Sequence, residues 1–499
     1  MSAAPRPDAH AEYEVVIGLE VHVHLATASK LFSPAPVRYG DPPNHDVHPV
    51  DLGLPGVLPV LNARAVELGI RAALATRCRI QPRSIFARKN YFYPDLPKGY
   101  QISQYEEPLA TGGSLAFEAD GRAVRVGLTR IHLEEDAGKS IHETAIAGRE
   151  GSHVDLNRAG VPLLEIVSEP DLRSPEEAGA YLRALRQVLR YAGVSDADLE
   201  KGQFRCDANV SLRRRGEAKL GTRTELKNLN SFRFVEEALR AEIERQAAIL
   251  DGGAAVQQAT MHYDPARGTT RVMRTKENAD DYRYFPDPDL IPLTIDPAAV
   301  EAVRRALPEL PEDKRERFRR EYGLSAGDIA ILIESRARAD FFEAAARSLA
   351  ERSRDGDEAP ARRIAKWMLR DVLAQLKEGD REIEATRLTP EALAALVALV
   401  EAGRVTAASA RPLVAVLMER GGDPEPLVRE RGLEAVSDAS LLERAADEAI
   451  AAHPDVAAQV RAGEAKGLHF LIGQVMKRTG GKADPKAVRE ILSRRVRGV

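Results

Sequence analysis

The chain has 499 residues, of which 30% are charged and 5% aromatic, and its formal net charge is −4. A chain of this length is too long for a single hydrophobic core, so we expect roughly three domains. The slightly negative balance excludes a uniformly basic protein, so any nucleic acid must contact a local basic patch.

The sequence favours a cytoplasmic protein. Its two cysteines, Cys78 and Cys206, lie far apart without a CxxC pattern, which suits a reducing compartment and argues against a disulfide framework. The polar start of the chain predicts no signal peptide. No apolar run approaches the ~20 residues that a membrane-spanning helix needs. We therefore expect no membrane association.

Residues 14–24 alternate between apolar and polar side chains, which predicts a β-strand with one buried face. Glu20, His22 and His24 share the polar face. Solvent exposure alone would explain such a face. The same three side chains are also good ligands held on a rigid element, so a functional site remains an alternative. The preceding residues 1–12 are polar and predicted to be disordered.

The next segment, residues 33–60, is a proline-rich loop, and Asn62 is expected to cap a helix that runs to Ala75. Residues 88–103 are predicted to form a second loop, in which lysines alternate with aromatic side chains. Such a loop suits contact with phosphates and bases. A small aromatic core is an equally good interpretation.

Residues 130–139 predict a strand that ends in an acidic run. Arg130, His132 and Glu134 share one face, and Glu135 and Asp136 follow directly. Adjacent carboxylates repel one another, so we expect positive groups close to them unless they form a solvated turn.

Two more strands are predicted in this half of the chain, over residues 161–167 and 203–212, and their polar side chains include Glu165, Arg205 and Asp207. Residues 222–230 follow, with Glu225 and Lys227. If these strands share a sheet with residues 14–24, their carboxylates converge. Carboxylates and an imidazole suit a magnesium-type cation, and magnesium beside lysine and arginine is typical of phosphoryl transfer. Spacing in the sequence does not establish the convergence.

Helices are predicted from Ser174, which is expected to cap its helix, to Ala192, and from about Ser231 to Leu250. Composition changes near Pro292, beyond which amphipathic helices dominate. The last 25 residues are strongly basic, which indicates either contact with a nucleic-acid backbone or a solvated helical end. The basic residues that we consider as possible contacts to a nucleic-acid backbone are Lys477, Arg478, Lys482 and Lys486.

Several long segments resemble one family, the B subunits of the bacterial glutamyl/aspartyl-tRNA amidotransferases. They are IGLEVH (17–22), GLPGVLPVLN (53–62), RKNYFYPDLPK (88–98), HLEEDAGK (132–139), EIVSEPD (165–171), DYRYFP (281–286), FLIGQVM (470–476) and GGKADP (480–485). The resemblance extends over essentially the whole chain after the first dozen residues.

The resemblance implies an α+β fold: a catalytic cradle domain on a mixed or antiparallel sheet (1–294), an all-α helical domain (295–405) and a small all-α tail domain that binds tRNA (406–499). The implied reaction uses ATP and Mg²⁺. It phosphorylates the side-chain carboxylate of Glu-tRNA(Gln) or Asp-tRNA(Asn), and ammonia then displaces the phosphate. The implied partners are the A subunit, an amidase that supplies ammonia, the small C subunit, the misacylated tRNA and a non-discriminating aminoacyl-tRNA synthetase.

By the same resemblance, the metal-centred site maps onto Glu20, His22, Glu135, Glu165 and Asp207. Of these, Glu135, His22 and Glu165 are the expected catalytic residues. Phosphate or substrate contacts map onto Lys89, Lys98, Arg205 and Lys227. The basic tail, with Lys477, Arg478, Lys482 and Lys486, would hold the tRNA.

The chain departs from many family members in the proline-rich loop. Four cysteines bind a structural zinc there in the family, but the corresponding positions here are Ser33, Ala35, His48 and Asp51. Because serine and alanine offer no thiolate, we expect no structural zinc. We expect proline rigidity and packing to hold the loop instead.

Two functional hypotheses of different class follow. The chain is either an ATP-dependent amidotransferase subunit that carries the activation chemistry or a non-catalytic tRNA-binding scaffold of the same complex. The intact acidic and histidine positions favour the first.

Overall fold

The computed structural model describes residues 12–141, 151–229, 231–275, 279–352, 359–435, 439–461 and 465–497. The prediction of disorder for residues 1–12 therefore lies outside the described residues, apart from Glu12. The chain divides into two compact units, Met1–Asp313 and Lys314–Val499.

The first unit is built on a mixed sheet that has ten strands within the described residues, in the order β15-β14-β13-β12-β1-β11-β8-β6-β2, with β7 also paired to β8. Neighbouring strands are antiparallel, except that β13 and β14 are parallel. The strands are β1 (Tyr13–His24), β2 (Arg79–Ile80), β6 (Ala110–Thr111), β7 (Ser114–Ala119), β8 (Arg122–Glu135), β11 (Pro162–Ser168), β12 (Phe204–Arg214), β13 (Thr224–Leu229), β14 (Ala259–Asp264) and β15 (Thr269–Thr275).

Short strands form three smaller sheets. These are β16 (Phe285–Pro286) with β4 (Phe86–Asn90) and β5 (Tyr100–Gln104), β9 (Lys139–Ile141) with β10 (His153–Asp155), and β3 (Arg83–Ser84) with β17 (Leu293–Thr294). The prediction that residues 88–103 form a loop is therefore wrong at both ends. The ends pair as antiparallel strands, which satisfies their backbone hydrogen bonds.

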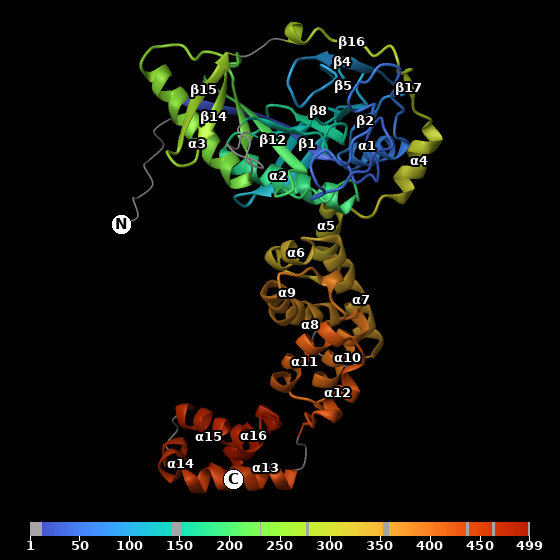
Figure 1. The fold of residues 1–499 in the computed structure, drawn as a ribbon. Helices are drawn as coiled ribbons and strands as arrows, with labels where there is room; N and C mark the ends of the chain where they lie inside the picture. The colour runs from blue at the N-terminus through green and yellow to red at the C-terminus, as the bar shows by residue number, and fades with distance from the viewer. Residues whose placement is uncertain are drawn as a thin grey trace. The chain divides into compact units, whose positions relative to one another are not determined.

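Helices α1, α2 and α3 pack against the sheet of the first unit and share its hydrophobic core (Figure 1). The first unit's helices are α1 (Ala63–Ala75), α2 (Pro175–Tyr191), α3 (Phe232–Asp251), η1 (Ala279–Tyr282) and α4 (Pro297–Ala306). The side chains of Asn62, Ser174 and Ser231 accept hydrogen bonds from the first-turn amides of α1, α2 and α3, which confirms the three predicted starts.

Strand β1 shows how the sheet separates core from site. Its apolar side chains Leu19, Val21 and Val23 are at most 1% exposed and lie in the core under the helices. Glu20 and His22 alternate with them and therefore lie on the opposite face. The alternation predicted for residues 14–24 is confirmed, and the polar face is the one that carries the candidate site.

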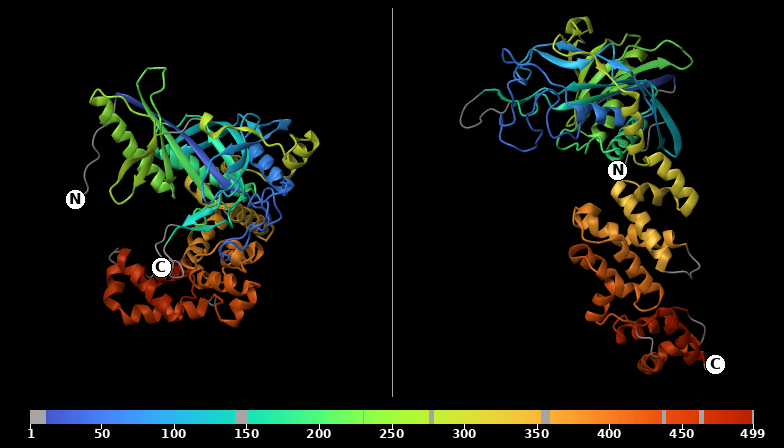
Figure 2. Two further views of the ribbon diagram at one scale, coloured as in Figure 1. Left: turned by 45° about the horizontal axis from the view of Figure 1, so that its top comes forward. Right: turned by 90° about the vertical axis from the view of Figure 1, so that its right-hand side faces the viewer.

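The second unit is helical throughout its described residues (Figure 1; Figure 2). Its helices are α5, which begins in the first unit (Pro311–Tyr322), α6 (Ala326–Leu332), α7 (Arg336–Arg352), α8 (Pro360–Trp367), the π-helical turn η2 (Met368–Val372), α9 (Leu373–Glu378), η3 (Ile383–Ala385), α10 (Pro390–Glu401), α11 (Ala407–Arg420), α12 (Pro424–Glu430), α13 (Ala439–Ala452), α14 (Pro454–Arg461), α15 (Ala465–Arg478) and α16 (Pro485–Arg497). The predicted α+β class, with a sheet-based first part followed by helices, is confirmed.

The boundaries between the hydrophobic cores fall at different residues from the predicted domain boundaries. Val303 of α4 is buried in the first unit's core, so that unit extends beyond residue 294. The second unit contains two cores, one within 318–428 and one within 442–496. Because α11 contributes Leu413 and Leu417 to the first of these cores, the predicted start of the tail at 406 falls inside a packed helical body.

Among the described residues, no helix is both long enough and apolar enough to cross a membrane.

Candidate active site

The register of four neighbouring strands places a row of charged side chains across the polar face of the sheet. Arg205 on β12 pairs with His22 on β1, His22 pairs with Glu165 on β11, and Glu165 pairs with His132 on β8. Directly paired residues project to the same face, so the row is a consequence of the register. Residues distant in the sequence meet here because the sheet order is β12-β1-β11-β8.

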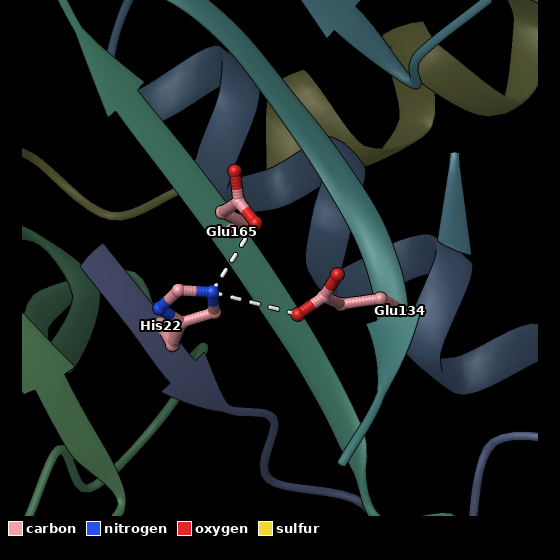
Figure 3. Close-up of side chains that lie close together, drawn as sticks. All are labelled: His22, Glu134 and Glu165. Atoms are coloured by element: carbon pink, nitrogen blue, oxygen red, sulfur yellow. Dashed lines mark hydrogen bonds and ion pairs between the residues drawn. The ribbon is translucent and has the colours of Figure 1, made fainter. Parts of the chain in front are cut away.

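The centre of the row is a cluster of His22, Glu134 and Glu165, which we call the carboxylate–histidine cluster (Figure 3). His22 Nε2 lies 3.2 Å from Glu165 Oε2 and 3.5 Å from Glu134 Oε1. One potential ligand atom from each residue lies within 4.8 Å of the others. Glu134 and Glu165 are 3% and 8% exposed, so both carboxylates are held away from bulk water.

Ion pairing within the cluster raises the pKa of its histidine and lowers the pKa of its glutamates. Burial alone would lower the pKa of His22, but the hydrogen bond and charge of Glu165, together with Glu134, raise it to about 9. Burial alone would raise the pKa of Glu165, but the positive charges of His132, His22 and Lys89 hold it well below its usual range. The carboxylates are therefore ionised at neutral pH and present negative charge to whatever binds beside them.

The three consecutive carboxylates at the end of β8, Glu134, Glu135 and Asp136, have different partners. Glu134 accepts a hydrogen bond from Ser103 Oγ at 3.0 Å and faces the cluster. Glu135 forms a short ion pair with Lys98 and accepts a hydrogen bond from the Ile102 amide at 2.9 Å.

Asp136 is the third carboxylate of the run, and its oxygen Oδ2 meets one imidazole and two guanidinium groups. It lies 2.8 Å from His24 Nε2, 2.8 Å from an Arg205 guanidinium nitrogen and 3.2 Å from Arg158 Nε. Burial alone would raise the pKa of Asp136, but these arginines and His24 hold it well below its usual range. The expectation of positive groups beside the run is confirmed for each of its three carboxylates.

Glu135 does not lie where the predicted metal set places it. The structure groups Glu134, not Glu135, with His22 and Glu165. Side chains alternate along β8, so Glu134 shares the face of His132, whereas Glu135 is drawn toward β5 by Lys98 and the Ile102 amide. The alternation seen in the sequence was the signal that could have selected Glu134.

Glu20 and Asp207 extend the polar face along β1 and β12, where they are directly paired. Burial raises the pKa of Glu20, and the charges of Glu165, Glu225 and Asp207 raise it further, which shows that four carboxylates lie close together. Lys227 Nζ lies 2.8 Å from Asp207 and 3.4 Å from Glu225 and offsets part of this charge. The predicted Glu20 and Asp207 are thus near the cluster but outside its three-residue group.

The predicted phosphate-contacting residues surround the cluster, but most already have partners. Lys98 is paired with Glu135, Arg205 with Asp136 and Lys227 with Asp207. Lys89 Nζ instead lies 4.8 Å from the centre of the Tyr282 ring, and no carboxylate in the described part of the chain lies within ion-pair distance of it. Of these four residues, Lys89 is therefore the one without a carboxylate partner among the described residues.

The basic residues of the tail belong to the second unit. Lys477 and Arg478 end α15, Lys482 follows it, and Lys486 lies in the first turn of α16. Lys477, Arg478 and Lys486 are exposed, and Lys482 is half-buried. They are accessible to a large anionic partner.

The proline-rich loop is held by a buried ion pair. Lys30 Nζ lies 3.0 Å from Asp51 Oδ2, and the two side chains are 0% and 2% exposed. Asp51 also accepts a hydrogen bond from the His48 backbone amide at 2.9 Å. Two of the four positions that replace cysteines thus stabilise the loop by a charge-assisted contact, which the sequence did not reveal.

Comparisons with known proteins agree with this fold and site. Residues 15–301 match the family model of the GatB/GatE catalytic domain, and residues 340–496 match the GatB domain. The sheet and its polar face lie in the first match, so the first unit belongs to the family of GatB/GatE catalytic domains. The basic tail lies in the second match.

Relatives match the chain over nearly its full length. The B subunit of the aspartyl/glutamyl-tRNA(Asn/Gln) amidotransferase of Halorhodospira halophila is 52% identical over 98% of this chain and 100% of the relative. The B subunits of the same name from Alkalilimnicola ehrlichii and Moorella thermoacetica are each 50% identical over 97% of this chain, and over 99% and 100% of their own lengths. The chain belongs to the family of B subunits of tRNA-dependent amidotransferases.

Proposed function

We propose that this chain carries the activation step of tRNA-dependent amidation, in which ATP phosphorylates the side-chain carboxylate of glutamate or aspartate attached to tRNA. The observation that carries the proposal is the carboxylate–histidine cluster, whose potential ligand atoms lie within 4.8 Å of one another on a face bordered by cations. A carboxylate is a poor electrophile until one of its oxygens becomes part of a leaving group, and such an arrangement suits phosphoryl transfer.

The residues of the cluster fit Mg²⁺. Two ionised carboxylates and an imidazole offer hard oxygen ligands and one nitrogen, and Glu20 and Asp207 add two further carboxylates close by. His22, Glu134 and Glu165 would hold the ion, which supplies charge neutralisation for the phosphates of ATP when bound. Because each ligand must give up its proton, His22 would lose its proton on binding.

In the first step, an oxygen of the substrate carboxylate forms a bond to the γ-phosphorus while the bond to the bridging oxygen of ADP breaks. Lys89, which has no carboxylate partner among the described residues, contacts the transferred phosphoryl group. Arg205, Lys227 and Lys98 are each held by a carboxylate, which fixes their positive charges beside the cluster. Their fixed positions mean that little reorganisation is needed as charge develops.

In the second step, the nitrogen of ammonia forms a bond to the acyl carbon while the carbon–oxygen bond to phosphate breaks. The nitrogen must lose a proton, and we assign this proton to Glu135. Its carboxylate is 3% exposed, adjoins Glu134 in the chain and is oriented by Lys98 and the Ile102 amide. The proposed catalytic set is therefore Glu135, His22 and Glu165, together with Glu134, which lies beside His22 and Glu165 in the cluster.

The names of the relatives support the choice of substrate and partners. Each is the B subunit of an aspartyl/glutamyl-tRNA(Asn/Gln) amidotransferase, so Glu-tRNA(Gln) and Asp-tRNA(Asn) are the proposed substrates. The proposed partners are the A subunit, an amidase that releases ammonia from glutamine, the small C subunit and a non-discriminating aminoacyl-tRNA synthetase. The exposed Lys477, Arg478 and Lys486, with Lys482, bind the tRNA backbone.

The experiment uses the complex of this chain with its amidase and small subunits, supplied with misacylated tRNA, ATP and Mg²⁺. Ammonium replaces glutamine, so the amidase activity is bypassed. Glu134→Gln and Lys89→Met are expected to lose amide formation while tRNA binding is retained, and the exposed Glu118→Gln serves as a control. Equal amide formation by wild type, Glu134→Gln and Lys89→Met would show instead that the chain is a tRNA-binding scaffold.

A further inference from the structure

A second group of potential metal ligands lies in the proline-rich loop, outside the large sheet. Among the described residues, one ligand atom each of Asp41, His45 and Asp46 lies within 4.8 Å of the others, and we call these three residues the loop triad. None of the three occupies one of the four positions at which many family members carry zinc-binding cysteines. The loop triad is therefore separate both from those positions and from the carboxylate–histidine cluster.

The separations within the loop triad suit a small cation. His45 Nδ1 lies 2.9 Å from Asp46 Oδ1 and 3.7 Å from Asp41 Oδ2. In a tetrahedral site whose metal–ligand distances are about 2.0–2.1 Å, neighbouring ligand atoms are separated by about 3.3 Å. The two measured separations lie on either side of this value, so small side-chain rotations would place all three ligand atoms around one ion.

Asp46 is the buried member of the loop triad, and one of its oxygens lacks a partner. Its side chain is 2% exposed. Oδ1 contacts His45, whereas Oδ2 is buried and has no hydrogen-bond partner among the described residues. Because both oxygens are bonded to the same carbon atom, Oδ2 lies beside Oδ1 at the loop triad. A buried carboxylate oxygen without a partner is costly, and a bound cation would remove this cost.

The cationic side chains of the loop do not fill this role. The buried Lys30 forms its ion pair with Asp51. Arg38 Nη1 lies 3.6 Å from Asp41 Oδ2, but these two side chains are 59% and 32% exposed, and an ion pair so exposed contributes little. Asp41 is therefore free to turn toward an ion held by His45 and Asp46.

The backbone around the loop triad is fixed by the segment that includes and follows β10. The Asn44 amide donates a hydrogen bond to Asp155 Oδ1 at 3.1 Å, and the Asp46 amide donates one to Asn157 Oδ1 at 2.9 Å. Asn157 Nδ2 in turn donates to the Pro42 carbonyl at 2.8 Å. Ligands on a backbone that is already held in place bind a metal more readily than ligands that must first be gathered.

We propose that the loop triad binds one divalent cation of the zinc type, with His45 Nδ1 and an oxygen from each aspartate as ligands, and that this ion stabilises the proline-rich loop. An imidazole with two carboxylates suits Zn²⁺ better than Mg²⁺, which prefers oxygen ligands and retains water. The side chain of His45 is 59% exposed, so water can supply the fourth ligand. The inference does not rest on the proposed function, because the ion has a structural role.

The test measures the Zn²⁺ bound per complex by equilibrium dialysis and metal analysis, with the complex that contains the amidase and small subunits. His45→Ala and Asp41→Asn are each expected to weaken Zn²⁺ binding at this site at least about 100-fold, because the loss of even an outer contact of a metal ligand typically costs about 10- to 100-fold. Both side chains are partly exposed, so both variants are expected to fold.

Two control variants show where the ion is bound. His469→Ala removes an exposed histidine of α15 and is expected to leave the bound Zn²⁺ unchanged. Glu134→Gln removes a ligand of the carboxylate–histidine cluster and is expected to leave the ion of the loop triad in place. As a second readout, Zn²⁺ is expected to slow amide hydrogen exchange at residues 44–46 in wild type but not in His45→Ala.

Three outcomes would overturn the proposal. The first is equal Zn²⁺ binding by wild type, His45→Ala and Asp41→Asn. The second is loss of Zn²⁺ in Glu134→Gln alone, which would assign the ion to the carboxylate–histidine cluster. The third is an equal loss in His45→Ala and His469→Ala, which would show adventitious binding to exposed histidines.

Discussion

The structure distinguishes two adjacent glutamates, and this difference can be tested through Mg²⁺. Glu134 Oε1 lies 3.5 Å from His22 Nε2, whereas Glu135 is engaged by Lys98. We expect Glu134→Gln to raise the Mg²⁺ concentration needed for half-maximal activity. We expect Glu135→Gln to lower the rate at saturating Mg²⁺ while leaving that concentration nearly unchanged.

The magnitude follows from the charge that is removed. With the 3.5 Å between His22 Nε2 and Glu134 Oε1 taken as the scale of distances within the cluster, two unit charges interact by about 5 kcal/mol at an effective dielectric constant of about 20. Dehydration of the ion and the ligand opposes this gain, so we expect a net loss of about 3 kcal/mol, which corresponds to a shift of about 100-fold in the required Mg²⁺ concentration.

The assay is ammonium-dependent amide formation during a Mg²⁺ titration, combined with direct binding of Mn²⁺ to the same complex. Glu118→Gln, on an exposed site of β7, controls for the loss of one carboxylate elsewhere. An unchanged Mg²⁺ requirement in Glu134→Gln, or a shift in Glu135→Gln alone, would refute the assignment of Glu134 to the cluster.

Three further predictions concern stability and tRNA binding. Lys30→Met should destabilise the first unit by about 3–5 kcal/mol, measured by denaturant unfolding, because it leaves Asp51 buried without its cation. The double variant Lys30→Met with Asp51→Leu should recover part of this loss of stability. Burial alone would raise the pKa of Glu343, but hydrogen bonds and ion pairs with its neighbours lower this pKa to about 2. The ionised Glu343 therefore stabilises the folded second unit at pH values above the pKa of an unfolded glutamate. This stabilisation is lost as the pH falls toward 2. After allowance for screening, the second unit should lose about 1–2 kcal/mol more between pH 5 and 2 in wild type than in Glu343→Gln, and equal acid sensitivity would contradict this. Lys477→Glu and Lys486→Glu should weaken tRNA binding at low salt and reduce its salt dependence without changing ATP binding, which filter-binding titrations would measure.

The sequence predicted those features that depend on neighbouring residues. The alternation over residues 14–24 identified β1 and its polar face, because side chains of a strand point to opposite sides with a period of two. Asn62 and Ser174 identified helix starts, because a side-chain oxygen at that position satisfies first-turn amides. The expectation of positive groups beside Glu134 also followed from neighbouring residues, because adjacent carboxylates repel one another.

Only the tertiary structure decided which side chains meet. His22 and Glu165 are neighbours because β11 lies between β1 and β8, and strand order is set by packing over the whole sheet. The alternation along residues 130–134 placed His132 and Glu134 on one face, but only the register of β8 against β11 brings that face next to Glu165.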